Sequence, residues 1–385
     1  MYDDIVSFIR KTYKDYNGEG FIPLHEPRFL GNEKKYLNEC IDSTFVSSVG
    51  KFVDQFEQML CEFTGSKYAV ATVNGTAALH ISLILAEVKE SDEVLTQALT
   101  FVATANAISY VGAHPIFIDS AKDNPGLCPE DLKIFLLENS EMRNDGHTYN
   151  KKTGRRIKAC IPMHTFGHPV KMDEIMAVCS KHNIFVIEDA AESIGSTYKG
   201  KATGTIAPIG IVSFNGNKTL TCGGGGALLI QDETVAKRAK HLTTTAKMPH
   251  KWNFFHDEIG YNYRLPNLNS ALICAQLEQL PLFVKNKRET AALYRDFFSS
   301  FKNITFLDEQ KDCESSFWLN ALIFESYEER EDFLEFTNEK LVMTRPIWML
   351  MSDLPAFKDC QRTELKNAKW FEQRVVNIPS SVRLK

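Results

Sequence analysis

From Tyr68 to about Gln231, short apolar runs alternate with longer segments of helical pattern. A run of four to eight apolar residues is typical of a buried strand. The predicted strands are Tyr68–Val73, Glu93–Gln97, Pro115–Asp119, Lys158–Met163, Ile184–Glu188, Gly210–Phe214 and Ala227–Ile230. The helical segments between them include Ala77–Ala86, Pro129–Glu138 and Met172–His182. Strands separated by helices need crossover connections, so we predict an α/β fold with a mostly parallel seven-stranded sheet between helices.

The chain on either side of this region predicts further helices. Met1–Tyr16 is expected to form a short amphipathic helix, and another lies near Asn32–Ser43. A long helix is predicted over Leu268–Phe301, with Pro281 inside it as a point for a kink. The polar stretch Asn139–Arg156 indicates a surface excursion. We divide the chain into an N-terminal arm with helices (1–45), a large domain (46–279) and a smaller C-terminal domain (280–385).

Composition narrows the class of protein. A net charge of −5 and a pI of about 6.1 give no sign of a nucleic-acid partner. The nine cysteines stand singly, without a CxxC pair, which argues against disulfides and against a metal site. No apolar signal segment opens the chain, and no uncharged apolar run approaches the ~20 residues of a membrane span. We therefore expect a cytoplasmic protein without a membrane partner.

A candidate phosphate site follows the first predicted strand, in the sequence NGTAA at 74–78. A junction of strand, glycine and helix presents backbone N–H groups and the positive end of a helix dipole. The sequence lacks the GK[ST] ending of a P-loop and the GxGxxG of a dinucleotide site. On local grounds it is equally well read as a capped helix start.

A candidate acid and a candidate amine follow later strands. Asp189 comes directly after the run 184–187, where an open parallel sheet places its ligands, although an aspartate there could also cap a helix. Lys218 lies in a loop, with Ser213 before it and four glycines at 223–226 after it. The glycines allow a close backbone approach or positive φ, or they form only a tight turn. A lone loop lysine is most often a surface residue.

In this order, the pieces meet the needs of one cofactor, pyridoxal 5'-phosphate (PLP). Lys218 would form the Schiff-base link, and Asp189 would keep the pyridine nitrogen protonated. Phe101 follows the second strand and would stack on the ring, or else it is a core aromatic. The predicted phosphate cradle consists of Gly75, Thr76, Ala77 and Ser213.

Over nearly its whole length the sequence resembles the DegT/DnrJ/StrS sugar aminotransferases. The matching motifs are NGTAAL (74–79), TFVATAN (100–106), HTFGHPVKMDEI (164–175), EDAAES (188–193), SFNGNK (213–218), GGGGAL (223–228) and GYNYRLPNLNSA (260–271). The resemblance implies a fold type I PLP enzyme with a smaller C-terminal α+β domain. It adds Glu192, often Gln in the family, near the phenolic oxygen of the cofactor. It also adds Asn262, reaching the cofactor phosphate of the neighbouring subunit, and hence a homodimer.

Three segments are similar to the legionaminic-acid-pathway branch of that family: 21–36, 43–57 and 241–252. This similarity implies amination at C4 of a 2-acetamido-2,6-dideoxy-4-keto-hexose linked to UDP or GDP, with L-glutamate as the amino donor. We expect Lys218 to anchor the cofactor and then to act as the general base, while Asp189 stabilises the developing charge.

Four other readings compete with this one. Another keto sugar nucleotide could be the substrate. A related PLP dehydratase is disfavoured, because those relatives carry histidine in place of the lysine. A non-enzymatic regulator of the same fold would not need Lys218 and Asp189 intact. A nicotinamide enzyme would need the missing GxGxxG fingerprint.

Overall fold

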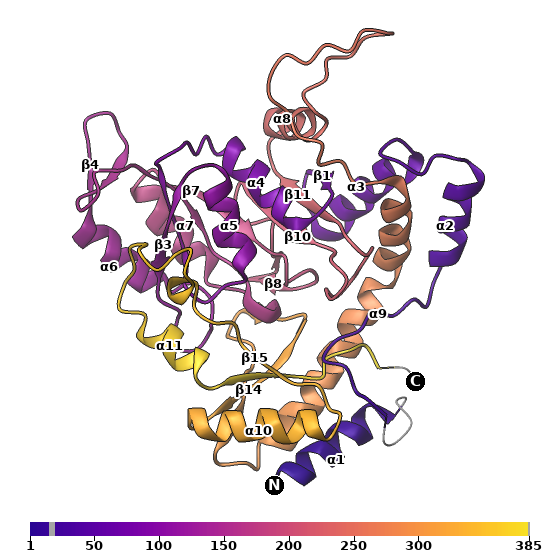
Figure 1. The fold of residues 1–385 in the computed structure, drawn as a ribbon, viewed down its shortest axis with the longest axis vertical. Helices are drawn as coiled ribbons and strands as arrows, with labels where there is room; N and C mark the ends of the chain where they lie inside the picture. The colour runs from indigo at the N-terminus through magenta and orange to yellow at the C-terminus, as the bar shows by residue number, and fades with distance from the viewer. Residues whose placement is uncertain (15–19, 384–385) are drawn as a thin grey trace.

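The computed structural model describes residues 1–14 and 20–383 (Figure 1). Its main feature is a seven-stranded sheet in the order β1-β11-β10-β7-β6-β2-β3. The strands are β1 (Tyr68–Thr72), β2 (Glu93–Gln97), β3 (His114–Ile118), β6 (Ile157–Ile161), β7 (Phe185–Asp189), β10 (Ile209–Ser213) and β11 (Gly226–Ile230). β11 runs antiparallel to both of its neighbours, and the other pairings are parallel. The predicted fold class is confirmed, and each predicted strand overlaps an observed one.

Helices cover both faces of this sheet, because its strands are apolar on both. Ile187 packs in a cluster with residues of α4, α5 and α8. Val186, its neighbour along β7, points to the other face and packs with α6 and α7, while α3 and α9 cover the rest of that face. The helices are α3 (Lys51–Thr64), α4 (Gly75–Leu85), α5 (Val102–Tyr110), α6 (Pro129–Asn139), α7 (Met172–Lys181), α8 (Glu233–Thr243) and α9 (Asn267–Phe298).

A second, smaller sheet has the order β12-β14-β16-β15 and is antiparallel. Its apolar side chains pack with those of α1, α10 and the second half of α9. These helices lie near the small sheet in Figure 1. No helix among the described residues is long and apolar enough to cross a membrane. The elements of this part are α1 (Tyr2–Thr12), β12 (Ile304–Phe306), β14 (Asn320–Phe324), α10 (Tyr327–Glu339), β15 (Arg345–Pro346), α11 (Lys366–Glu372) and β16 (Val375–Ile378).

The helices predicted near the N-terminus are present but pack in different places. α1 packs against the small sheet and α10, whereas α2 (Glu33–Asp42) packs on α9 beside the large sheet. The end of the predicted helix Met1–Tyr16 lies outside the described residues. α9 continues through Pro281 as one helix, so the predicted boundary between residues 279 and 280 falls inside it. The division into domains at that point stays a prediction.

The polar excursion predicted over Asn139–Arg156 contains a hairpin. Its strands are β4 (Ser140–Met142) and β5 (Thr148–Asn150), which pair antiparallel. Gly146 lies in the turn with φ of 77°, a backbone conformation that favours glycine.

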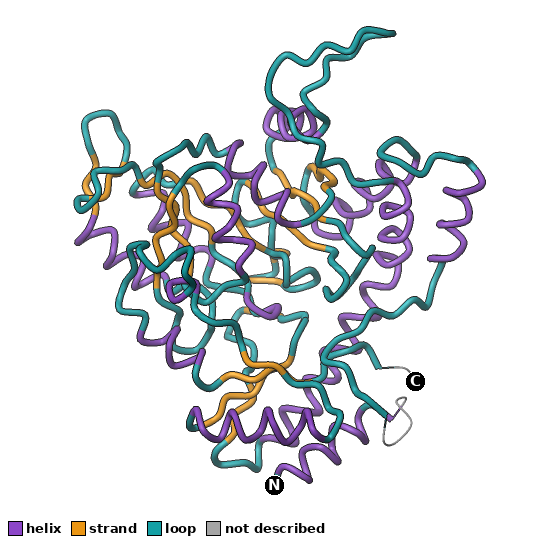
Figure 2. Tube along the Cα trace, viewed as in Figure 1, coloured by secondary structure: helices purple, strands orange, loops and turns teal. Residues whose placement is uncertain are grey.

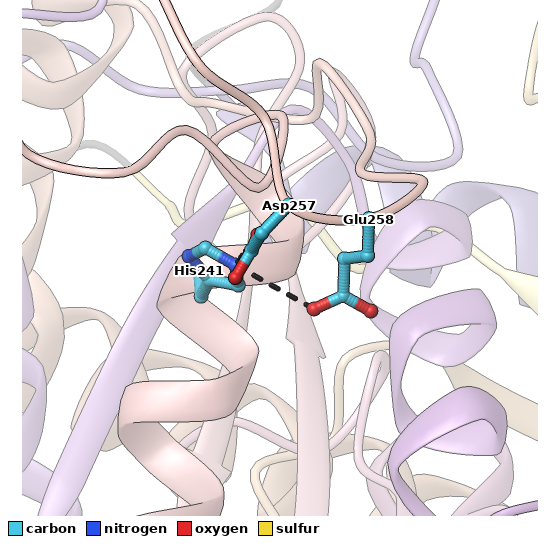
Figure 3. A group of neighbouring side chains, drawn as sticks. All are labelled: His241, Asp257 and Glu258. Carbon is cyan, nitrogen blue, oxygen red and sulfur yellow. Dashed lines mark hydrogen bonds and ion pairs between the residues drawn. The ribbon is translucent and has the colours of Figure 1, made fainter.

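Residues 244–262 form an arm that extends away from the body of the molecule (Figure 1) and is drawn as loop along its length in Figure 2. Its two legs lie side by side, joined by bridges from Thr244 to Asn262 and from Lys247 to His256. At its base, His241 Nε2 lies 2.8 Å from Asp257 Oδ1 and 3.5 Å from Glu258 Oε1 (Figure 3). Arg238 also pairs with Glu258. This ionic cluster links α8 to the returning leg of the arm.

Candidate active site

The cradle at the start of α4 is built by Asn74, which ends the turn after β1. Its side-chain Oδ1 accepts a 2.7 Å hydrogen bond from the N–H of Ala77 and caps the helix. The N–H groups of Gly75 and Thr76 belong to the first turn, which has no helical carbonyls to pair with. Gly75 and Thr76 line the site, at the positive end of the helix dipole.

Glycine at two positions lets this helix start lie directly on the sheet. A Cβ on Gly75 would come within 2.9 Å of Ser213 Cβ, so Gly75 brings the helix start against the end of β10. A Cβ on Gly226 would come within 2.5 Å of the Asn74 carbonyl carbon and 2.6 Å of the Gly75 nitrogen. Within the glycine run at 223–226, Gly226 therefore allows the backbone of β11 to lie close to the start of α4, one of the two possibilities that the sequence left open. Gly223, with φ of 82°, makes the turn that enters β11.

Asp189 ends β7 and is buried at the floor of the site. Its Oδ2 accepts a 2.8 Å hydrogen bond from the hydroxyl of Thr104, and its Oδ1 accepts one of 3.1 Å from the N–H of Ala191. Burial raises the pKa of the carboxyl, and these two donors oppose the rise. Each oxygen keeps a lone pair for a further donor.

Lys218 lines the same cavity as Asp189. The Nζ is 3.0 Å from Glu192 Oε1, and both side chains are buried. Glu192 Oε2 accepts a 3.0 Å hydrogen bond from the N–H of Phe166. Burial raises the pKa of Glu192, while the nearby Lys218 lowers it. The amine also lies 4.0 Å from the ring centre of Trp318.

These groups surround one cavity of about 260 Å³. It collects seven of the nine predicted site residues, namely Gly75, Thr76, Phe101, Asp189, Glu192, Ser213 and Lys218. Asp189 lines this cavity, and no helix among the described residues begins directly after it, so its role toward a ligand stays a prediction. Phe101 is 46% exposed, which fits a ring that faces the site better than a core aromatic.

Two predicted site residues lie elsewhere. The N–H of Ala77 is already bonded to Asn74, so its part in a phosphate cradle stays a prediction. Asn262 is exposed at the base of the arm, where its Oδ1 accepts a 3.3 Å hydrogen bond from Arg264 Nε, and it does not line this chain's cavity. That position agrees with a role toward a neighbouring subunit, which also stays a prediction.

Residues that the sequence did not reveal complete the surroundings. Thr104 and Ala191 lie inside the two motifs already singled out, so a hydroxyl three residues after Phe101 was a usable signal. Trp318 comes from a segment 100 residues downstream of Lys218 and carries no motif. Its place beside Lys218 is a result of tertiary packing alone.

The cavity fits PLP on the chemistry of its donors. The buried carboxylate of Asp189, which forms no ion pair among the described residues, suits a protonated pyridine nitrogen. The first turn of α4 and the hydroxyl of Ser213 suit a phosphate group. Lys218 offers the amine and Phe101 an exposed aromatic face. The four requirements meet at one edge of the sheet, where the parallel strands end.

Comparisons with known proteins show the family of the chain. Residues 29–385 match the model of the DegT/DnrJ/EryC1/StrS aminotransferase family. The chain is 36% identical to a GDP-perosamine synthase of Escherichia coli O157:H7 over 362 residues, 94% of this chain and 93% of that protein. It is 38% identical over 336 residues to EpsN of Bacillus subtilis, named as a pyridoxal phosphate-dependent aminotransferase, covering 87% and 84% of the two chains.

The fold also matches a solved structure. An aminotransferase of Helicobacter pylori involved in the biosynthesis of pseudoaminic acid superposes with a TM-score of 0.84 at 23% identity, covering 93% of each chain. At that level of identity the likeness concerns the fold.

Proposed function

Since the chain belongs to the DegT/DnrJ/EryC1/StrS aminotransferase family, and so is a PLP-dependent sugar aminotransferase, we propose that it moves the amino group of L-glutamate to C4 of a nucleotide-linked 4-keto-6-deoxyhexose. One observation carries the proposal: the amine of Lys218 lies in a cavity that also holds the buried carboxylate of Asp189 and the start of α4.

The binding roles follow from position. Gly75 and Thr76 would donate their N–H groups to the cofactor phosphate, with the hydroxyl of Ser213 as a further donor. Phe101 would cover one face of the cofactor ring. Ala191, whose N–H donates a hydrogen bond to Asp189, would lie against the opposite face of the ring. While Lys218 is attached to the cofactor, Glu192 would meet the phenolic oxygen, and burial, which raises its pKa, favours a proton to share there. Once Lys218 is released as an ammonium group, its charge opposes that rise and favours the carboxylate.

The catalytic roles follow from charge. Lys218 would carry the cofactor and then, once released, take the proton from the donor Cα and pass it on within the site. When bound, PLP withdraws electrons from the carbon that loses the proton. Asp189 would keep the ring nitrogen positive, and the bonds from Thr104 and Ala191 hold the carboxylate in line for it. The same residues serve both half-reactions, first with glutamate and then with the sugar.

Two lines of support bear on the sugar nucleotide. Three relatives at 30–36% identity are named GDP-perosamine synthases, which favours a GDP-linked 4-keto sugar. The similarity of segments 21–36, 43–57 and 241–252 to the legionaminic-acid branch favours a 2-acetamido-2,6-dideoxy-4-keto-hexose. A 2-acetamido sugar on GDP satisfies both, and its UDP-linked counterpart is the second candidate.

We further propose that the active protein is a homodimer with shared sites. The arm exposes large apolar side chains that a single chain leaves uncovered, with Phe254 80% and Ile259 82% exposed. Asn262, at the base of this arm, would reach the partner's cofactor phosphate. Mixing Lys218→Ala chains with Asn262→Ala chains tests this arrangement. A mixed dimer has one site with both residues intact, so mixing should restore activity that neither variant shows alone; no restoration would contradict shared sites.

The reaction itself is tested by the absorbance spectrum of the purified protein with PLP. A visible band that bleaches with L-glutamate and returns with one keto sugar nucleotide would establish the transaminase and identify its substrate. The panel should hold GDP- and UDP-linked 4-keto-6-deoxyhexoses, each with and without the 2-acetamido group. A band that bleaches and never returns would discard these sugars, and a protein that shows no band with PLP would contradict the proposal.

A further inference from the structure

Trp318 is fixed beside the reactive lysine by contacts at both its ends. Its indole Nε1 donates a 2.7 Å hydrogen bond to the carbonyl of Asn217, the residue directly before Lys218. Its own carbonyl accepts a 3.1 Å hydrogen bond from Lys287 Nζ, which is buried in α9. Trp318 is only 4% exposed. Its ring can therefore move little relative to the Lys218 backbone.

The amine of Lys218 is enclosed between a carboxylate and this ring. It lies 3.0 Å from Glu192 Oε1 and 4.0 Å from the centre of the Trp318 ring. The negative face of an aromatic ring attracts a cation within about 6 Å, and indole is the strongest such partner. The arrangement therefore holds an ammonium group from two sides.

Two other titratable groups lie near Lys218, Asp189 and His25, and neither forms a hydrogen bond with Glu192 among the described residues. Asp189, at the end of β7, is occupied by Thr104 and Ala191. His25 comes from the N-terminal segment, and burial, Lys287 and Lys218 hold its pKa well below 6.5. Its uncharged ring has both nitrogens buried without a partner among the described residues, so it does not compete for Glu192.

We propose that Trp318 and Glu192 form a holding site for the Lys218 ammonium group whenever that lysine is not attached to the cofactor. Trp318 is then a positioning residue, which keeps a long, mobile side chain close to the reacting carbon during each half-reaction. The proposal rests on the proposed function, because it takes Lys218 as the lysine that is attached and released.

The test measures the reactivity of Lys218 in cofactor-free protein. Each variant is treated briefly with acetic anhydride at pH 7, and acetylation of the Lys218 peptide is followed by mass spectrometry relative to exposed Lys201. In Trp318→Leu the amine should react roughly tenfold faster, the factor that ~1.4 kcal/mol of lost cation–π attraction represents. Trp318→Phe keeps an aromatic face and should stay within about threefold of the wild type.

A matched control removes a similar contact elsewhere. Trp370, on α11, has the guanidinium of Arg374 5.4 Å from its ring centre, and Trp370→Leu should leave Lys218 unchanged. Equal acceleration in Trp318→Leu and Trp318→Phe would mean that loss of packing is the cause, and this would overturn the holding site. Unchanged reactivity in both would overturn it too.

Two measures keep the test decisive. If Trp318→Leu does not fold by circular dichroism, protein carrying fluorinated tryptophan makes the same comparison, because fluorine weakens the ring's negative face at nearly constant volume. Faster acetylation supports the proposal, and an unchanged rate overturns it. A wild-type protein that forms no visible band with PLP would overturn the proposed function, whereas a normal band with unchanged Lys218 reactivity in the variants would overturn the holding site alone.

Discussion

Thr104 donates a 2.8 Å hydrogen bond to Asp189 Oδ2 and so joins the first turn of α5 to the last residue of β7. Phe101 lies three residues before Thr104, at the start of the same helix. One short segment therefore orients the acid at the floor of the cavity and also supplies its aromatic wall. The other oxygen, Oδ1, accepts from the N–H of Ala191, so both oxygens are held in place and each keeps a lone pair for a further donor.

Thr104→Val should slow the glutamate half-reaction about tenfold and leave the fold intact. Valine keeps the shape but removes the donor, and a hydrogen bond to a charged group contributes about 1.5–3 kcal/mol. Stopped-flow bleaching of the cofactor band measures the rate. Thr363→Val is the control, because the buried Thr363 hydroxyl has no hydrogen-bond partner among the described residues. Equal rates in both variants would show that the Thr104 bond does not orient Asp189.

Lys218→Ala should reduce turnover by more than roughly 10⁴-fold, since a general base alone contributes about 10²–10⁴ and the covalent link is lost as well. The variant should still take up PLP without covalent attachment, because the phosphate cradle is untouched. Borohydride reduction followed by mass spectrometry reads out the attachment site. Lys201→Ala, at an exposed lysine of β9 (Lys201–Ala202), should behave as wild type. Turnover by Lys218→Ala would remove that residue from the mechanism.

Asp189→Asn should fold normally and lose about 10²–10³ in the rate of proton removal, the usual cost of losing one electrostatic stabiliser. Asparagine can keep the hydrogen bond from Thr104 but supplies no negative charge to the ring nitrogen. Reconstitution with a cofactor analogue whose ring nitrogen carries a permanent positive charge should recover part of the lost rate. A rate unchanged by the substitution would assign the ring nitrogen to another partner.

The sequence was a good guide to the large sheet for a physical reason. Parallel strands covered on both faces are nearly continuous apolar runs, so Ile184–Glu188 was predicted within one residue of β7. The hairpin β4–β5 was missed, because Met142 and its neighbours are exposed and show no apolar alternation. A strand gives an apolar pattern in the sequence only where its side chains pack against a core.

The same reasoning explains which site residues were found. Asp189 and Ser213 end strands, and Gly75 begins a helix, so local pattern was enough to place them at one edge of the sheet. Trp318, whose carbonyl is bonded to Lys287 of α9, reaches Lys218 only through tertiary packing. The spacing of these residues in the sequence does not predict such contacts.

The glycine run allows a test inside a single motif. Gly226→Ala places a methyl group 2.5 Å from the Asn74 carbonyl carbon, so the start of α4 must shift. Overpacking of this kind costs about 1–3 kcal/mol, and the displaced cradle should bind PLP more weakly. Gly224→Ala is the matched control, because its methyl group would meet nothing closer than the Val73 carbonyl oxygen at 3.7 Å. Titration with PLP and urea unfolding compare the two, and equal behaviour would show that Gly226 is not needed for close approach.

Lys287 gives the stability of the protein a predictable dependence on pH. Burial lowers its pKa from 10.5 to about 7, and its hydrogen bonds to the carbonyls of Trp318 and Ser380 supply no full negative charge to offset that. Between these two pH values the unfolded chain binds the extra proton, so the free energy of unfolding rises with pH. The penalty for the buried charge is complete below about pH 7 and absent above about 10.5.

Lys287→Met removes the titrating group, so the difference between wild type and variant isolates its effect. Relative to the variant, the wild type should gain up to ~1.4 kcal/mol of unfolding free energy for each pH unit between pH 7 and 9.5. Urea unfolding at pH 7, 8 and 9 measures this slope, with Lys285→Met, at an exposed lysine of the same helix, as the control. A difference that stays constant over that range would mean that Lys287 keeps its proton in the folded protein, held by the two carbonyls in spite of burial.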